Sequence, residues 1–292
     1  MNSKPATLRA LRREGADYLE EHGLEQTALR DAELLLRQAL AMSRASFFSH
    51  LDTTMDLTTE QRNGYLLDLQ QRAAHVPIQY LLGRQEFYGL EFRVTPGVLI
   101  PRPETEHLVE AAEGYLRKMS VDGSGLVLAE IGVGSGAISL ALAHLLPGLL
   151  VHASDISPIP LQQSAVNAEQ LGLTKQIRLF LGDLLAPLPL ERYDMIISNP
   201  PYIPSAEIAA LACDVQQEPQ IALDGGPDGL HFYRRLLQET IPRLQVNGLL
   251  ALEIGFGQAN DIIALSEKEG WLIRQSISDF AGIERVLLLQ RK

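Results

Sequence analysis

The sequence has little cysteine and few basic residues for its length. Cys213 is the one cysteine among 292 residues, so neither an internal disulfide nor a cysteine-rich zinc cluster is possible. We interpret it as a small buried or loop side chain rather than a nucleophile. The net charge is −11, which argues against tight, non-specific binding to nucleic-acid phosphates, although a local basic patch is compatible with it.

The sequence also lacks a continuous hydrophobic run long enough to span a membrane. Its most apolar stretch, residues 125–153, is interrupted by Glu130, His144, Pro147 and several glycines, whereas a spanning helix needs about 20 apolar residues in a row. The opening MNSKPATLRALRREG becomes charged too early for a signal peptide. We therefore expect a cytoplasmic protein without membrane association.

Two regions of different character follow one another, as expected for a chain of about two domains. In the first, leucine and alanine recur at helical spacing, no strand pattern is visible, and Thr58 or Thr59 is expected to cap a helix that runs to about Ala74. A period-two stretch with its turn at Gly89 then predicts a β-hairpin. The expected parts are a helical domain for partner recognition (1–83), a hairpin linker (84–97) and a larger domain (98–292).

The larger domain (98–292) alternates between short apolar strands and amphipathic helices. This alternation predicts an α/β fold with a mostly parallel sheet and helices on both faces. The expected strands are 126–131, 150–154, 177–181, 194–198, 248–254, 271–277 and 284–290. The expected helices are about 136–146, 159–171, 229–244 and 257–269.

A glycine-rich turn, E-I-G-V-G-S-G-A, follows the first of these strands. Gly132, Gly134 and Gly136 permit a tight turn and a close backbone approach to a ligand at the carboxyl edge of the sheet. Gly132, Gly134 and Ala137 also fit the dinucleotide pattern of dehydrogenases. Glu130 argues against that alternative, because an acid two residues before the first glycine would repel a pyrophosphate but attract a ligand ammonium.

Acidic residues also follow the next two strands. Asp155, in H-A-S-D-I-S, is placed to accept hydrogen bonds from both ribose hydroxyls of a nucleoside. Asp183 follows the third strand, where it either accepts a hydrogen bond from an adenine amino group or caps a turn or helix. S-adenosyl-L-methionine suits this set because it has an amino group, a ribose and no phosphate; its product would be S-adenosyl-L-homocysteine.

The fourth strand ends in Asn199-Pro200-Pro201-Tyr202. Proline cannot continue a central strand, and the residue before a proline is held extended. The Asn199 side-chain carbonyl and the Pro200 backbone carbonyl can therefore converge on one NH₂ group, while Tyr202 can stack on a flat group. Two such acceptors would orient a planar nitrogen for methylation and stabilise its developing charge. The alternative is a plain strand stop followed by a proline loop.

Several longer blocks resemble one family, the peptide chain release factor glutamine methyltransferases (HemK/PrmC). N-P-P-Y alone is shared with adenine-N6 DNA methyltransferases, so the other blocks carry the specificity. Besides the glycine turn and N-P-P-Y-I, they are P-I-Q-Y-L-L-G (77–83), E-F-Y-G (86–89), V-L-I-P-R-P-E-T-E (98–106), A-S-D-I-S (153–157), E-P-Q-I-A-L-D-G-G-P-D-G-L (218–230) and L-E-I-G-F-G-Q (252–258).

The resemblance implies a seven-stranded, Rossmann-like class I methyltransferase domain with its last strand antiparallel, preceded by a helical domain and a hairpin. The implied reaction moves a methyl group from S-adenosyl-L-methionine to the glutamine side-chain amide in the Gly-Gly-Gln motif of class I release factors, without a metal. The implied cofactor site has Gly132, Gly134 and Gly136 along the methionine part, Asp155 on the ribose, Asp183 near the adenine and Asn199 beside the cofactor. Asn199 and Pro200 are implied to hold the substrate amide, with Pro201 and Tyr202 next to them.

The roles of Arg102, Glu104 and Glu106 in a family block stay open, because helix capping and salt bridging explain them equally well. Elsewhere this sequence departs from the family pattern. The departures are Glu130 and Glu284, where aspartate is expected, and Gln216-Gln217, where an aromatic residue is expected before Glu218-Pro219.

Three other functions stay open at this point. A ribosomal-protein glutamine methyltransferase is disfavoured by the P-R-P-E-T-E block, and a nucleic-acid adenine methyltransferase by the lack of a basic recognition region. A non-catalytic nucleotide-binding module would have no need of Asn199. We therefore expect release factors as partners, with no stable nucleic acid and no membrane.

Overall fold

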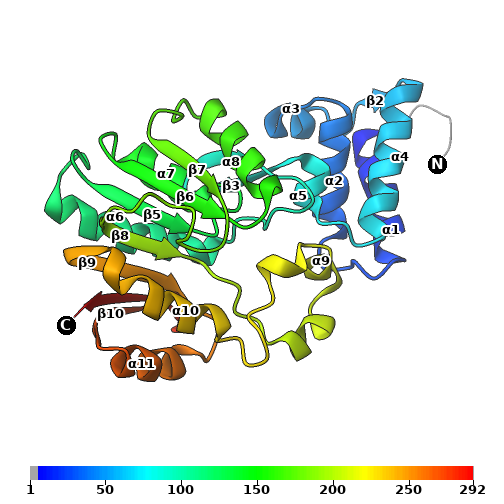
Figure 1. The fold of residues 1–292 in the computed structure, drawn as a ribbon. Coiled ribbons are helices and arrows are strands. Elements are labelled where there is room, and N and C mark those ends of the chain that lie inside the picture. Colours follow the sequence, from blue (N-terminus) through cyan, green and yellow to red (C-terminus); the bar gives the residue numbers. More distant parts are fainter. Residues whose placement is uncertain (1–5, 292) are drawn as a thin grey trace. The chain divides into compact units, whose positions relative to one another are not determined.

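The computed structural model describes residues 6–291, which form two compact units (Figure 1). The first unit runs up to Gly83 and also includes Ala212–Gln217. The second comprises Arg84–Leu211 and the chain from Glu218 onward. The short segment Ala212–Gln217, which the sequence had assigned to the catalytic part, thus belongs with the N-terminal helices.

The first unit is helical, as predicted. Thr58 caps one of its helices through a capping box with Gln61. The expectation of no strand is wrong, because Ala6–Thr7 (β1) pairs antiparallel with Thr54–Met55 (β2); two residues are too few to show a period. The helices are α1 (Leu8–Glu20), α2 (Ala28–Ala39), α3 (Arg44–Ser49), α4 (Thr59–Ala73), α5 (Ile78–Leu82) and α9 (Cys213–Gln216). Cys213 is exposed at the start of α9.

A buried ion pair links the helices of the first unit. Arg72 on α4 is 2% exposed, and its Nε donates to Asp31 Oδ2 on α2 at 2.8 Å. Its Nη2 lies 2.9 Å from Asp214 Oδ2, which ties α9 to α4. Burial alone would lower the pKa of Arg72, but the hydrogen bonds to Asp214 and Asp31 raise it, so the guanidinium stays charged.

The second unit contains the predicted seven-stranded sheet, in the order β10-β11-β9-β8-β5-β6-β7. The last strand, β11, is antiparallel to both neighbours, whereas β8, β5, β6 and β7 are parallel. The strands are β5 (Val127–Ile131), β6 (Leu150–Asp155), β7 (Ile177–Leu181), β8 (Tyr193–Ser198), β9 (Leu244–Glu253), β10 (Trp271–Ser278) and β11 (Glu284–Arg291). The predicted hairpin is confirmed as β3 (Arg84–Phe87) and β4 (Leu90–Arg93).

Helices cover both faces of this sheet, because successive strand residues point to opposite sides. Met195 of β8 packs into one hydrophobic cluster with α6, α7 and α8, and Ile196 packs into another with α10 and α11. The helix expected over 229–244 ends early, since Pro242 lacks an N–H and a 3₁₀ turn (Ile241–Arg243) follows. The helices are α6 (Glu106–Met119), α7 (Ala137–Leu145), α8 (Pro158–Gln170), α10 (His231–Glu239) and α11 (Ala259–Lys268). Within residues 6–291, no helix is both long and apolar enough to cross a membrane.

The buried Asp31–Arg72 pair yields a stability prediction. Asp31→Asn leaves a buried guanidinium with one charged partner fewer, so the free energy of unfolding should fall by about 3 kcal/mol. The matched control is Asp52→Asn, which breaks an exposed pair with Arg9 and should leave stability unchanged within error. Urea unfolding of the full chain measures both, and equal effects of the two substitutions would contradict the prediction.

Candidate cofactor and substrate site

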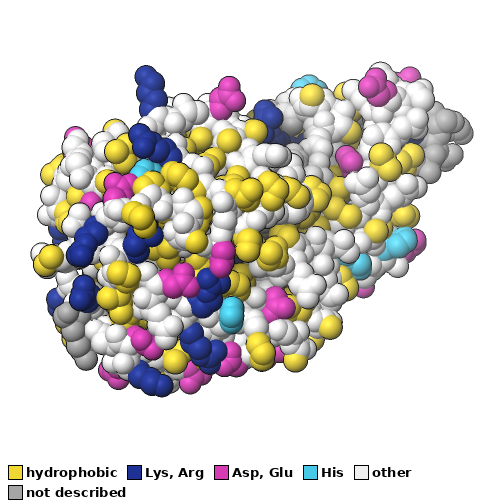
Figure 2. Space-filling model, viewed as in Figure 1, with side chains coloured by type: hydrophobic (Ala, Val, Ile, Leu, Met, Phe, Trp, Pro, Cys, Tyr) yellow, Lys and Arg dark blue, Asp and Glu magenta, His cyan; other side chains and the backbone are white. Residues whose placement is uncertain are grey.

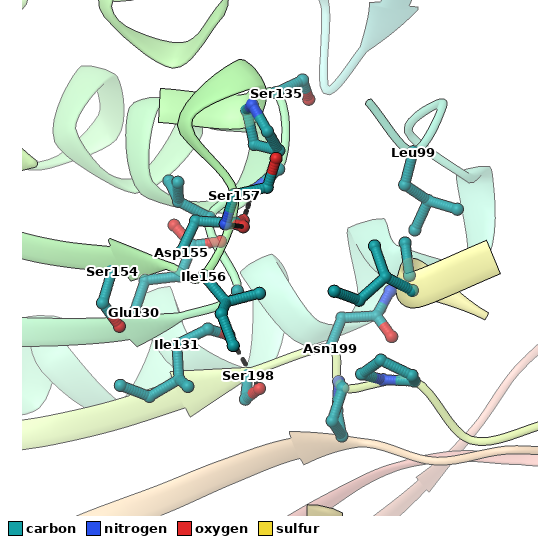
Figure 3. A pocket seen from close by; sticks show the side chains of 18 of the residues that line it. Leu99, Glu130, Ile131, Ser135, Ser154, Asp155, Ile156, Ser157, Ser198 and Asn199 are labelled. Carbon is teal, nitrogen blue, oxygen red and sulfur yellow. Dashed lines mark hydrogen bonds between the residues drawn. The ribbon is translucent and has the colours of Figure 1, made fainter. Parts of the chain in front are cut away.

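A cavity lies at the carboxyl edge of the sheet in the second unit (Figure 3). The ends of β5, β6 and β8 contribute Ile131, Ser154 and Ser198 to its wall. Residues 99–102 line it from before α6, and residues 199–201 line it from the loop after β8. Motifs far apart in the sequence therefore meet at one cavity, as the ends of neighbouring parallel strands should.

Two of the three turn glycines face this cavity. Gly132 and Gly134 have φ of 77° and 56°, and a Cβ atom added to either would meet no described atom within 4 Å. Gly136 has a different task, since it is outside the cavity lining and a Cβ there would lie 2.6 Å from Ser164 Oγ and 2.9 Å from Leu140 Cδ1. It therefore allows α7 to start close to α8, while its predicted contact with the methionine part stays a prediction.

Glu130 lines the cavity although it is only 1% exposed. Its Oε2 accepts the backbone N–H of Ser139 at 3.0 Å and also the Ser139 hydroxyl. Burial raises the pKa of Glu130 to about 8, and the hydrogen bonds from Ser139 oppose this rise. A cation bound in the cavity would favour the ionised form.

Asp155 and Asp183 also line the cavity, with different partners. Asp155 Oδ2 accepts from the Gly134 N–H at 3.2 Å and Oδ1 from the Ser157 N–H at 2.9 Å. Burial raises the pKa of Asp155, and these backbone hydrogen bonds oppose the rise. Asp183 is held by Arg235 of α10, whose two Nη atoms donate at 3.0 and 2.7 Å. Carboxylate oxygens have further lone pairs, so both side chains can still accept hydrogen bonds from a ligand. The roles of Asp155 at a ribose and of Asp183 at an adenine stay predictions.

The N-P-P-Y segment divides between the cavity and the core. Asn199, Pro200 and Pro201 line the cavity, and Asn199 Nδ2 donates to Thr105 Oγ1 at 3.3 Å. Tyr202 is outside the described lining and packs on the cluster that contains α10 and α11. A Cβ at Gly255 would lie 2.9 Å from the Tyr202 ring, and burial raises the pKa of Tyr202 to about 12. Stacking of Tyr202 on a substrate stays a prediction.

Sequence reasoning left the role of Arg102 open, and the structure supplies its partner. The Glu218 carboxylate is buried, accepts the Ile100 N–H at 3.0 Å and pairs with the Arg102 guanidinium. This contact joins the segment before α6 to the segment that carries Pro219, and both border the cavity. Glu106 accepts the Tyr88 N–H at 2.8 Å and so fixes the hairpin turn to α6.

Two functional candidates, Thr105 and Glu253, were missed. Both are buried next to Asn199, and each lies in a block that the resemblance had singled out, 98–106 and 252–258. Block membership was the available signal, since nothing in the local sequence shows which side chain faces inward. Among residues 6–291, no group of three or more His, Cys, Asp or Glu side chains is arranged to hold a metal.

The sheet order, the glycine turn and the acids at the strand ends define a class I methyltransferase domain. Residues 105–217 match the model of the methyltransferase small domain, and residues 10–83 match that of the PrmC N-terminal domain. Domains of this class use S-adenosylmethionine in general. A methyltransferase structure from Pyrococcus furiosus shares the fold, with a TM-score of 0.52 and 21% identity over 75% of this chain and 97% of that one.

Two relatives narrow this class to a family. The release factor glutamine methyltransferase of Moorella thermoacetica is 42% identical over 98% of this chain and 99% of its own length. That of Geobacter sulfurreducens is 40% identical over 92% of each. The chain belongs to the release factor glutamine methyltransferase family, so the resemblance inferred from the sequence blocks is confirmed and the protein is an enzyme.

The glycine turn gives a paired prediction. Gly136→Ala adds a clash to an unfavourable φ and should lower the free energy of unfolding by about 2 kcal/mol or more. Gly134→Ala meets no clash, but its positive φ is unfavourable for alanine, so the free energy of unfolding should fall by about 1 kcal/mol. Its methyl group enters the cavity and should weaken S-adenosylmethionine binding about tenfold. Urea unfolding and calorimetric titration measure the two effects. Weaker binding in Gly136→Ala at unchanged stability would place Gly136 against the ligand instead.

Glu130 predicts how stability depends on pH. Its pKa rises from about 4.3 in an unfolded chain to about 8 in the folded one, so the unfolded state releases the proton first. The contribution of Glu130 to the free energy of unfolding is therefore complete below about pH 4.3 and is lost as the pH rises through 8. Glu130→Gln removes this loss. Without cofactor, the free energy of unfolding of the variant should therefore exceed that of the wild type by an increasing amount from pH 5 to pH 8. Parallel stability curves from urea unfolding would contradict this.

Proposed function

We propose that this chain methylates the glutamine side-chain amide in the Gly-Gly-Gln motif of class I peptide chain release factors, with S-adenosyl-L-methionine as methyl donor. Family membership supports the substrate, since the named relatives are release factor glutamine methyltransferases. One geometric observation supports the chemistry. Asn199, whose amide nitrogen donates a hydrogen bond to Thr105, borders the same cavity as Gly132 and Gly134.

The cavity suits S-adenosylmethionine by the chemistry of its lining. The open backbone at Gly132 and Gly134 permits close approach of a ligand chain. Glu130, Asp155 and Asp183 make the lining acidic, which favours a sulfonium and an ammonium and disfavours a pyrophosphate. Glu130 would hold the ammonium, Asp155 the ribose hydroxyls and Asp183 the region of the adenine. The bound cofactor would supply an electrophilic methyl group.

Asn199 and Pro200 would activate the acceptor by geometry and charge. An amide nitrogen is a weak nucleophile because its lone pair is delocalised into the carbonyl group. Asn199 Oδ1 and the Pro200 carbonyl would each accept one N–H, which aligns the nitrogen with the methyl group. As the N–C bond forms and the S–C bond breaks, both acceptors stabilise the positive charge on nitrogen. The extra proton then leaves to water, so no strong base is required.

Charge distribution supports a protein acceptor over a nucleic acid. The chain carries a net charge of −11. On the face in Figure 2, lysine and arginine side chains are interspersed with aspartate and glutamate rather than gathered in one patch. Strong phosphate contacts need a concentrated basic surface.

We assign the helical unit to release-factor recognition and place the activity in the cytoplasm, in translation termination.

Mass spectrometry tests the acceptor directly. The wild-type chain is incubated with S-adenosylmethionine and, in separate reactions, a purified class I release factor, a ribosomal-protein mixture and duplex DNA. We expect one methyl group on the Gly-Gly-Gln glutamine and none on the other two substrates. Methylation of an adenine or a ribosomal-protein glutamine, with an unmodified release factor, would refute the proposal.

Asn199→Ala tests the proposed acceptor pair. Loss of one charge-stabilising contact should lower kcat at least about a hundredfold, whereas the dissociation constant for S-adenosylmethionine should stay within about twofold. Asn260→Ala is the matched comparison variant, because this exposed asparagine of α11 is outside the described lining of the cavity, and it should leave both quantities unchanged. Equal losses of cofactor binding and turnover in Asn199→Ala would make Asn199 a cofactor-binding or folding residue instead.

A further inference from the structure

Two buried side chains from outside the N-P-P-Y loop surround the Asn199 amide. Thr105, 4% exposed, ends the 3₁₀ turn Pro103–Thr105, and Glu253, 2% exposed, ends β9. The strands β8 and β9 are parallel with Ser198 opposite Leu252. Asn199 follows the last residue of β8, and Glu253 is the last residue of β9, so the backbone register brings them side by side.

A hydrogen bond joins two of these three side chains. Asn199 Nδ2 donates to Thr105 Oγ1 at 3.3 Å. Burial raises the pKa of Glu253 to about 7, and hydrogen bonding from Thr105 and from Asn199 opposes that rise. Both side chains therefore favour the ionised form of the Glu253 carboxyl group. Its Oε2 has no hydrogen-bond partner among the described residues.

The direction of these hydrogen bonds matters for Asn199. An asparagine amide can exchange its C=O and NH₂ ends by a half-turn that changes its shape very little. An ionised carboxylate only accepts hydrogen bonds. An ionised Glu253 would draw the Thr105 hydroxyl proton, which would leave Thr105 Oγ1 to accept from Asn199 Nδ2, the hydrogen bond that the structure shows. The amide is then fixed with its nitrogen toward these partners and its Oδ1 free to accept.

Packing alone does not explain such a group. A buried carboxyl group with an unpartnered oxygen lowers stability relative to a well-packed neutral side chain. The strand register places Glu253 beside the residue whose carbonyl must face an NH₂ substrate. A flipped Asn199 would present its own NH₂ to that substrate, so donor would meet donor.

We propose that Thr105 and Glu253 are positioning residues that hold Asn199 with Oδ1 toward the substrate. The inference rests on the proposed function only for the identity of the NH₂ group. The directional constraint applies to any acceptor that binds through an NH₂.

A pair of Thr105 variants tests this. Thr105→Val keeps the shape but removes the hydroxyl, so kcat should fall about tenfold while KM for the acceptor and cofactor affinity stay within about twofold. Thr105→Ser restores the hydroxyl and should recover most of the lost rate. Equal rates in Val and Ser variants, or a parallel loss of cofactor affinity in Thr105→Val, would overturn the proposal.

The pH profile supplies a second readout. Protonated Glu253 can donate and no longer dictates the direction of the group, so wild-type kcat at saturating cofactor should fall as the pH drops below about 7. Glu253→Gln does not titrate and should lose this limb; an unchanged profile would overturn the role of Glu253. The charged and titratable side chains that face Glu253 are Arg285, Glu104, Tyr202 and Tyr233, and all are unaltered in the variant.

A structural readout separates this inference from the proposed function. If the wild type methylates no glutamine, the proposed function fails, and the kinetic comparison moves to whichever NH₂ acceptor it does methylate. Independently of turnover, NMR of the ¹⁵N-labelled chain reports hydrogen exchange of the Asn199 side-chain NH₂. This exchange should be faster in Thr105→Val than in Thr105→Ser, and identical rates would refute the hydrogen bond itself.

Discussion

The parallel pairing of β8 with β5 on one side and β9 on the other is the constraint on which the site depends. It sets Ile131 and Leu252 opposite Ser198. The strand register alone therefore brings the glycine turn and Glu253 to either side of Asn199. The Ser198 hydroxyl donates to the Ile131 carbonyl at 2.8 Å and secures the end of the strand. Two prolines then end β8, which leaves this edge open for a ligand.

A second theme is the burial of carboxyl groups around the cavity. Burial raises the pKa of Glu130, Asp155 and Glu253, and in each case hydrogen-bond donors recover part of the cost. A cationic cofactor would recover more for Glu130 and Asp155, because it favours their ionised forms. Glu253 is outside the described lining of the cavity and has no such ligand. Its carboxyl group acts on Asn199 and Thr105 instead, which is why we assign it to positioning rather than to binding.

Periodicity and turn chemistry were enough to predict the strands of the seven-stranded sheet, the hairpin and the edge of the sheet where the motifs meet, but not the two-residue strands β1 and β2. The pairs Asn199–Thr105, Arg102–Glu218 and Asp183–Arg235 were not predictable, because each joins residues far apart in the chain and depends on side-chain direction. Gly136 shows the same limit: its spacing matches Gly134, yet it faces a helix and not the cavity. The sequence pattern therefore gave the location of the site, and tertiary packing assigned the tasks within it.

The longer acid at position 130 is consistent with this division of tasks. An aspartate, expected from the resemblance, has one methylene fewer and therefore a shorter reach. The Glu130 carboxylate reaches the first turn of α7, where Ser139 satisfies Oε2 through its N–H and hydroxyl. Oε2 is thereby committed to the helix, although Glu130 also lines the cavity. Substitutions that neutralise Glu130 or Glu253 should thus raise stability at neutral pH at the expense of cofactor binding or acceptor alignment, since the same desolvation produces both effects.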